Sequence, residues 1–192
     1  MNAFSDNNIF GTTAIVLLLA LVAFATVIDF KSHRIPNILL FPALSIALIL
    51  HTIGGGVDGL IMTTSGLAIG LAMLLPLYVT GGMGAGDVKL LGVVGSFIGP
   101  WGAVVAGLAT MMAGAVFGIV VIVWHRVWPI LEFHAAQLVN GRDTGAERTL
   151  HSHASYSEDR ITHMPYAAAI AAGTLAALWY LDLLPDQLLG LT

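Results

Sequence analysis

The sequence of 192 residues contains no cysteine. The chain therefore forms no disulfide, offers no thiolate to a zinc ion and has no cysteine nucleophile. Charged residues are also scarce, at 9% of the chain against about 25% in an ordinary soluble domain. Together with 57% hydrophobic residues, this composition predicts an all-α, polytopic membrane protein whose core is formed by helices packing against one another in lipid.

Several motifs that carry enzyme chemistry are missing. The chain has no His-Glu-x-x-His element of a zinc protease, no Gly-x-Ser-x-Gly elbow and no Gly-x-x-x-x-Gly-Lys-Ser/Thr nucleotide loop. Gly84-Ala85-Gly86 is too short for a dinucleotide fingerprint. His151 and His153 lack a supporting set of ligands and are interpreted as residues of a solvated loop. No cofactor, metal ion or nucleic-acid partner is therefore expected.

Five uncharged stretches are candidates for crossing a hydrocarbon core, which needs about 20 residues per helix. They are residues 10–28, 35–53, 59–80, 90–124 and 161–181. The fourth stretch is too long for one crossing, and Gly99-Pro100-Trp101 interrupts it with a turn signal and an interfacial aromatic residue. Dividing it there predicts about six transmembrane helices. The fourth of these, at about residues 87–99, is short, so it must be tilted, partial or shielded by its neighbours.

Basic residues set the expected orientation of these helices. With the N-terminus outside, all seven Lys and Arg residues fall in cytoplasmic stretches, as the positive-inside tendency requires. Five crossings would instead export residues 125–160 with their four arginines. The six-helix arrangement places Asp29, at the end of the first span, and Asp87, at the start of the fourth, on the cytoplasmic side.

The whole chain, residues 1–192, is expected to form a single membrane-embedded domain. Residues 1–8 carry Asp6 and no basic residue, so the first apolar run is interpreted as an uncleaved span and not as a signal peptide. The long polar stretch at about residues 125–162 is expected to be a cytosolic loop, partly disordered. Gly66-x-x-x-Gly70 and Gly114-x-x-x-Gly118 fit close helix packing, but with 22 glycines in the chain they carry little functional weight.

Asp29 and Asp87 stand out, because carboxylates at the edges of membrane-length apolar runs cost free energy unless they are paired, solvated or neutralised. Two carboxylates that share a site tend to hold one proton between them. The ionised member then takes a proton from a water that attacks a peptide carbonyl, which the protonated member polarises. Gly84 and Gly86 permit a close approach of a substrate backbone.

The residues around both aspartates resemble a known family. Asp29 with Arg34-Ile35-Pro36-Asn37, followed by Gly84-Ala85-Gly86-Asp87-Val88-Lys89-Leu90, is similar to the type IV prepilin peptidases, which are membrane aspartyl proteases of the Gly-x-Gly-Asp class. The resemblance covers about residues 20–125, with a weaker echo at Met164-Pro165-Tyr166. It implies Asp29 and Asp87 as the catalytic pair. It also implies substrate-binding or site-shaping roles for Gly84, Gly86, Lys89, Pro36, Asn37, Pro165 and Tyr166.

This resemblance implies removal of the leader peptide from prepilins or pseudopilins at the cytoplasmic face of the bacterial inner membrane, with membrane lipids as further partners. Many family members add an N-terminal cytosolic domain with paired cysteines and methylate the new pilin N-terminus. This chain begins at its first span without cysteine, so it looks closest to the short form of Flp/Tad pilus systems, which lacks the methyltransferase domain. Ala167 stands where the family usually has glycine. The oligomeric state does not follow from the sequence.

Two other functions fit the aspartates. An ion or proton-coupled transporter would use them as relay carboxylates, although both map to one side of the membrane. An intramembrane protease of the presenilin or signal-peptide-peptidase type shares Gly-x-Gly-Asp, but this chain has no Pro-Ala-Leu element near its last span. Two residues of the motif also have structural interpretations. Asp87 is suited to cap a helix N-terminus, and Lys89 to determine topology.

Overall fold

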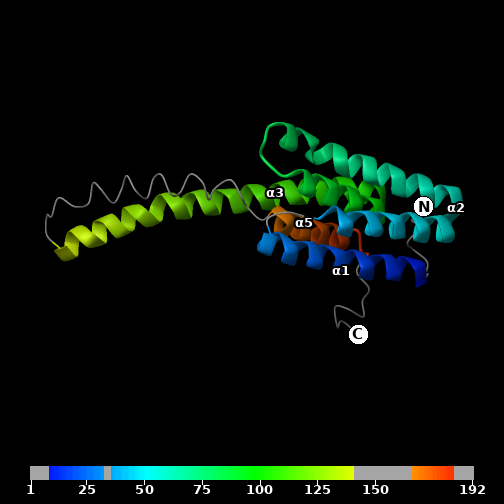
Figure 1. Ribbon diagram of the computed structural model, residues 1–192, viewed down its shortest axis with the longest axis horizontal. Helices are drawn as coiled ribbons and strands as arrows, with labels where there is room; N and C mark the ends of the chain where they lie inside the picture. Colours follow the sequence, from blue (N-terminus) through cyan, green and yellow to red (C-terminus); the bar gives the residue numbers. More distant parts are fainter. Residues whose placement is uncertain (1–8, 33–35, 141–165, 184–192) are drawn as a thin grey trace. The chain divides into compact units, whose positions relative to one another are not determined.

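The computed structural model describes residues 9–32, 36–140 and 166–183, which are helical apart from short turns (Figure 1). The helices are α1 (Ile9–Ser32), α2 (Asn37–Val79), α3 (Ala85–Asn140) and α5 (Tyr166–Tyr180). Three of them contain segments long and apolar enough to cross a membrane, whereas α5, with 15 residues, is apolar but shorter. The expected all-α, multi-pass membrane architecture agrees with these helices. The number of six crossings and the outward N-terminus remain predictions.

Helix α2 turns back on itself at Gly56. This residue has φ 59° and ψ −135°, a conformation that only glycine adopts readily. In Figure 1 the first arm, residues 37–55, runs one way and the second arm, residues 57–79, returns beside it. Gly59 lies directly against the backbone of His51, where a Cβ atom would collide with the carbonyl oxygen. The reversal falls between the two uncharged stretches that the sequence separates here.

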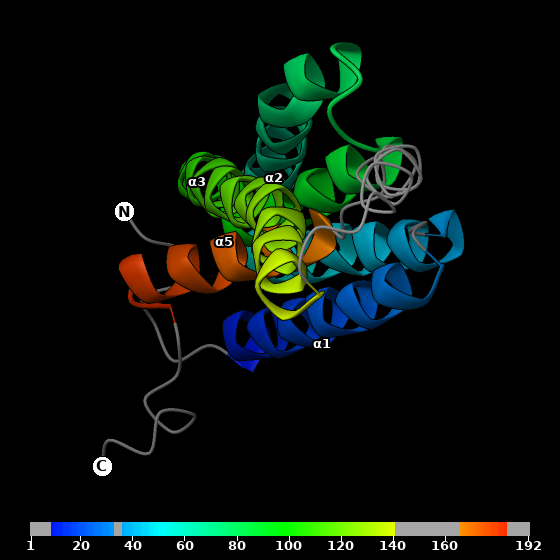
Figure 2. The same ribbon diagram turned by 90° about the vertical axis from the view of Figure 1, so that its left-hand side faces the viewer.

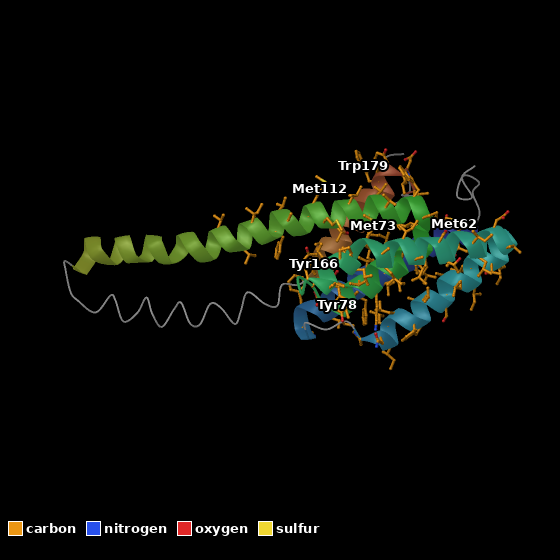
Figure 3. The ribbon with its side chains drawn as sticks, turned by 90° about the horizontal axis from the view of Figure 1, so that it is seen from above. Met62, Met73, Tyr78, Met112, Tyr166 and Trp179 are labelled. Atoms are coloured by element: carbon orange, nitrogen blue, oxygen red, sulfur yellow. The ribbon has the colours of Figure 1, made fainter. Side chains whose placement is uncertain are left out.

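Helix α3 also turns back, at Gly99, with φ 78° and ψ −179°. The side chain of Met62, labelled in Figure 3, occupies the space that a Cβ atom at Gly99 would need. Pro100 follows as the first residue of the second arm, where a missing N–H is harmless. The predicted division of the long apolar run at Gly99-Pro100 is therefore confirmed as a break in the helix.

The first arm of α3, residues 85–98, is short and enclosed. Every residue from 90 to 98 is buried, and the second arm of α2 packs against it through glycines. A Cβ atom at Gly66 would collide with the carbonyl oxygen of Gly95, and one at Gly70 would meet the backbone of Leu91. The sequence predicted that this short helix is tilted, partial or shielded by its neighbours. In the structure, neighbouring helices shield it. Helix α1 packs on α5 and on α2 (Figure 2).

The chain divides into two units, and the part of α3 from Gly114 onward belongs to the second. Within it, α3 continues to Asn140, so the prediction of a loop from about residue 125 is wrong for residues 125–140. The sequence there loses its uncharged character but retains good helix formers, such as Ala135-Ala136-Gln137-Leu138, so the helix does not end with the apolar run. The rest of the expected loop, with His151 and His153, lies outside the described residues.

Candidate active site

Asp29 and Asp87 come from helix ends that the fold brings together. Asp29 lies in the last turn of α1 and is only 6% exposed. Asp87 lies in the first turn of α3 and is partly buried. The two carboxyl groups are close enough to interact electrostatically. The structure thus places in one site the two aspartates that the sequence singles out.

A hydrogen bond from α5 holds the carboxylate of Asp29. The backbone N–H of Ala167 donates to Asp29 Oδ2 over 3.2 Å, in a buried position. One turn earlier on α1, the hydroxyl of Thr26 donates to the carbonyl oxygen of Val22 at 2.8 Å and reaches that of Ala167 at 3.5 Å. Thr26 was not among the site residues predicted from the sequence. Its only signal there is a hydroxyl three residues before Asp29, and thus on the same helix face.

The glycine-rich segment before α3 shapes the surroundings of Asp87. Gly81 has φ 77°, which favours glycine at the turn that ends α2. A Cβ atom at Gly84 would come within 3.3 Å of Asp87 Oδ2, so Gly84 lies directly beside the carboxyl group. The N–H of Asp87 donates to the carbonyl oxygen of Gly84 at 3.2 Å. Because α3 begins at Ala85, Asp87 sits within the first turn of the helix and not at its N-cap, and the helix dipole still favours a carboxylate there.

A second hydrogen bond joins the two sequence motifs. Lys89 Nζ donates to Asn37 Oδ1 over 3.0 Å. Asn37 is the first residue of α2 and follows Pro36, whose extended backbone (φ −71°, ψ 135°) forms the N-cap. The start of α2 is therefore tied to the first turns of α3, close to Asp87. Lys89 has a defined partner in the site region, in addition to any influence on topology.

Tyr166 completes the group of site residues in the described part of the chain. It begins α5, and its hydroxyl is within electrostatic range of Asp87. In Figure 3 the labelled Tyr166 and Tyr78 lie at the same end of the helices, whereas Met62 lies toward the other end. Gly86 is partly buried beside Asp87. Pro165, also expected to shape the site, lies outside the described residues.

An apolar groove of about 330 Å³ lies along α1 and the first arm of α2. It is lined by Leu17, Ala20, Leu21, Phe24, Leu39, Pro42, Ala43, Ile46 and Phe97. Phe24 is five residues before Asp29 on α1, and Leu39 is two residues after Asn37 on α2. The groove therefore begins within about two helical turns of the site and extends along the apolar part of both helices.

The chain is similar to known proteins. The model of a family described as "Type IV leader peptidase family" matches residues 16–119. Two curated relatives are described as "Prepilin leader peptidase/N-methyltransferase", one from Aeromonas salmonicida strain A449 and one from Aeromonas salmonicida. Each is 34% identical over 119 residues, which cover 57% of this chain and 40% of the relative.

The match thus spans about two-fifths of the length of these relatives. No solved structure matches the chain. The family match includes both aspartates and the glycines before Asp87, and it covers more than half of the sequence. The chain therefore belongs to the type IV leader peptidase family.

Proposed function

We propose that this protein is a membrane aspartyl endopeptidase that removes the leader peptide from type IV prepilins or pilin-like precursors. The observation that carries the proposal is the approach of Asp29 and Asp87, which are far apart in the sequence and close enough in the fold to interact electrostatically. The family match and the names of the two relatives support the substrate class. The proposal concerns peptide hydrolysis alone.

In the proposed mechanism the aspartates share one proton. The ionised carboxylate removes a proton from a water molecule as its oxygen attacks the scissile carbonyl, and the protonated carboxyl group donates a hydrogen bond to that carbonyl oxygen. When the tetrahedral intermediate collapses, the leaving nitrogen takes a proton from the pair and the C–N bond breaks. Gly84 and Gly86 leave the substrate backbone room beside Asp87, while Pro36, Asn37, Lys89, Pro165 and Tyr166 shape the site around it.

The proposed location of the reaction is the cytoplasmic face of the bacterial inner membrane. In the proposed topology the chain crosses six times with its N-terminus outside, and the reversals at Gly56 and Gly99 support this number. All seven basic residues then lie on the cytoplasmic side, together with both aspartates. A substrate must present its scissile bond at the membrane surface, and the apolar groove beside the site offers contact to an apolar segment of such a substrate.

The direct test is cleavage of a candidate prepilin by the purified chain in liposomes. Asp29→Asn and Asp87→Asn each abolish cleavage in the proposed mechanism, because an amide neither accepts a proton from water nor donates one to the leaving group. Asn still accepts a hydrogen bond from the N–H of Ala167, so the Asp29→Asn variant retains that contact. Asp58→Asn is the matched control, because Asp58 is an exposed aspartate next to the Gly56 reversal.

Cleavage at the wild-type rate by either site variant would exclude the shared-proton mechanism. A wild-type chain that leaves prepilins intact but moves protons or solutes into the liposomes would favour the transporter function instead.

A further inference from the structure

The first turn of α5 is hydrogen-bonded to one aspartate of the pair and lies within electrostatic range of the other. Ala167 donates its backbone N–H to Asp29, and the preceding residue, Tyr166, is within electrostatic range of Asp87. The hydrogen bond and the electrostatic interaction come from successive residues at the start of one helix. Neither residue falls in the range of the family match, which ends at residue 119.

We propose that the first turn of α5 positions the carboxylate of Asp29 through the N–H of Ala167. This proposal rests on the proposed peptidase function, since it concerns the geometry in which Asp29 works. Ala167 is a positioning residue in this scheme and touches no substrate. Its backbone, and not its side chain, supplies the interaction.

The physical basis is the set of unpaired donors at a helix start. The first four N–H groups of a helix have no partner within the helix, so the N–H of Ala167 is available to an outside acceptor. A bond from such a group to a carboxylate is charge-assisted and stronger than one between neutral groups. Because one oxygen of Asp29 is held, rotation of the carboxylate is restricted, and its other oxygen is presented in a fixed direction. Fixed orientation of a reacting group lowers the barrier of the chemical step.

The packing of α5 explains why a small residue occupies position 167. Ala167 is fully buried, and the hydroxyl of Thr26 reaches its carbonyl oxygen. The backbone of Ala167 is therefore contacted twice on the α1 side. Thr26 donates to its carbonyl oxygen, and Asp29 accepts from its N–H. Further along α5, a Cβ atom at Gly173 would collide with Thr110 of α3. The helix is thus held closely at two places, and a larger side chain at 167 would move its first turn away from Asp29.

The sharpest test removes the donor and leaves the side chain unchanged. Replacing Ala167 by its α-hydroxy acid, lactic acid, converts the backbone amide at this position into an ester without an N–H. The same replacement at Ala168 is the control, because it removes another N–H of the first turn that is not used within the helix. We expect kcat for prepilin cleavage to fall at least about tenfold for the ester at 167, in line with the strength of hydrogen bonds to charged groups. We expect KM to stay unchanged and the ester at 168 to match the wild type.

A side-chain series provides a second test. Ala167→Gly keeps the N–H and adds no bulk, so it should lower kcat less than a large side chain at the same position does. Ala167→Leu should lower kcat, whereas Ala172→Leu, at an exposed position of the same helix, should not. Membrane accumulation and helical circular dichroism of each variant establish that the fold is retained.

The outcomes separate the two proposals. If the wild-type chain cleaves no prepilin, the proposed function fails and the positioning role falls with it. If the wild type cleaves and the esters at 167 and 168 have equal kcat, the peptidase function stands and the positioning role is overturned. A change in KM alone for the ester at 167 would also overturn it, because a group that orients Asp29 acts on the chemical step.

Discussion

The side chain of Lys89 donates a 3.0 Å hydrogen bond to the side chain of Asn37. The two residues lie on different helices, α3 and α2, and belong to the two halves of the sequence pattern around the aspartates. Because Lys89 is two residues after Asp87, this bond fixes the start of α2 next to the first turn of α3. It links the first arm of α2 to the helix that carries Asp87.

Breaking this bond should lower peptidase activity without unfolding the protein. Both side chains are exposed, so their loss leaves no buried polar group unsatisfied. We expect Lys89→Met and Asn37→Leu each to reduce kcat/KM by about tenfold, since a small displacement of positioned groups has a large effect on rate. The double variant should be no worse than either single one, as expected for two residues that act through one contact.

Lys31→Met is the control for the loss of a positive charge, because Lys31 is also exposed and lies at the end of α1. If Lys31→Met reduces cleavage as much as Lys89→Met, the effect comes from net charge and not from the contact with Asn37. If the double variant loses as much kcat/KM as the two single reductions multiplied together, the two residues act independently, and the proposed role of their hydrogen bond is contradicted.

Gly84 lies so close to Asp87 that adding one methyl group there should disturb the reaction. The Cβ atom of an alanine would come within 3.3 Å of Asp87 Oδ2, which is tighter than most contacts of real Cβ atoms. The carboxyl group must then shift by a few tenths of an ångström, so we expect Gly84→Ala to lower kcat by roughly tenfold. Gly82→Ala, two residues earlier, meets only ordinary contacts at 3.4 Å or more and should cleave prepilin at the wild-type rate. Equal rates for the two variants would show that Asp87 tolerates the shift.

The conformation of Gly56 is the basis of the α2 reversal and can be tested by stability. A methyl group added at Gly56 or at its neighbour Gly55 would find open space, with no atom within 4 Å, but only Gly56 has a positive φ. We therefore expect Gly56→Ala to destabilise the protein by about 1–3 kcal/mol through backbone strain. Gly55→Ala should stabilise it by about 0.4–1 kcal/mol, because it reduces the freedom of the unfolded chain. Unfolding by SDS in mixed micelles measures both, and equal stabilities would argue against a strained turn at Gly56.

Some features of the fold and of the candidate site are visible in the sequence. Asp29 and Asp87 stand out because charge is rare in this chain, and the break at Gly99-Pro100 is visible because glycine and proline punctuate a helix that is too long for one crossing. Both features are local and chemical, so they can be recognised before the fold is known. The proximity of the two aspartates could be inferred only from the topology.

Contacts of the backbone were not predictable in the same way. The N–H of Ala167 has no signature in the sequence, because every residue except proline has such a donor. The two Gly-x-x-x-Gly patterns are also indistinguishable in the sequence, yet their glycines have different surroundings in the structure. Gly66 and Gly70 pack against the backbone of α3, whereas among the described residues no atom lies within 4 Å of a Cβ position at Gly118. Which glycine pattern meets a partner depends on the tertiary arrangement, and the continuation of α3 to Asn140 shows that a polar sequence does not by itself end a helix.

The proposed six-crossing topology can be tested by cysteine labelling, since the chain has no cysteine of its own to give a background. Asp58 and Lys31 are both exposed, and they lie near opposite ends of the first arm of α2. The topology places Asp58 outside and Lys31 in the cytoplasm. A membrane-impermeant maleimide should therefore label Asp58→Cys in intact cells and Lys31→Cys only after permeabilisation. Labelling of both positions from the same side would mean that the chain does not cross the membrane between them, and the arms of α2 would then have to be assigned differently.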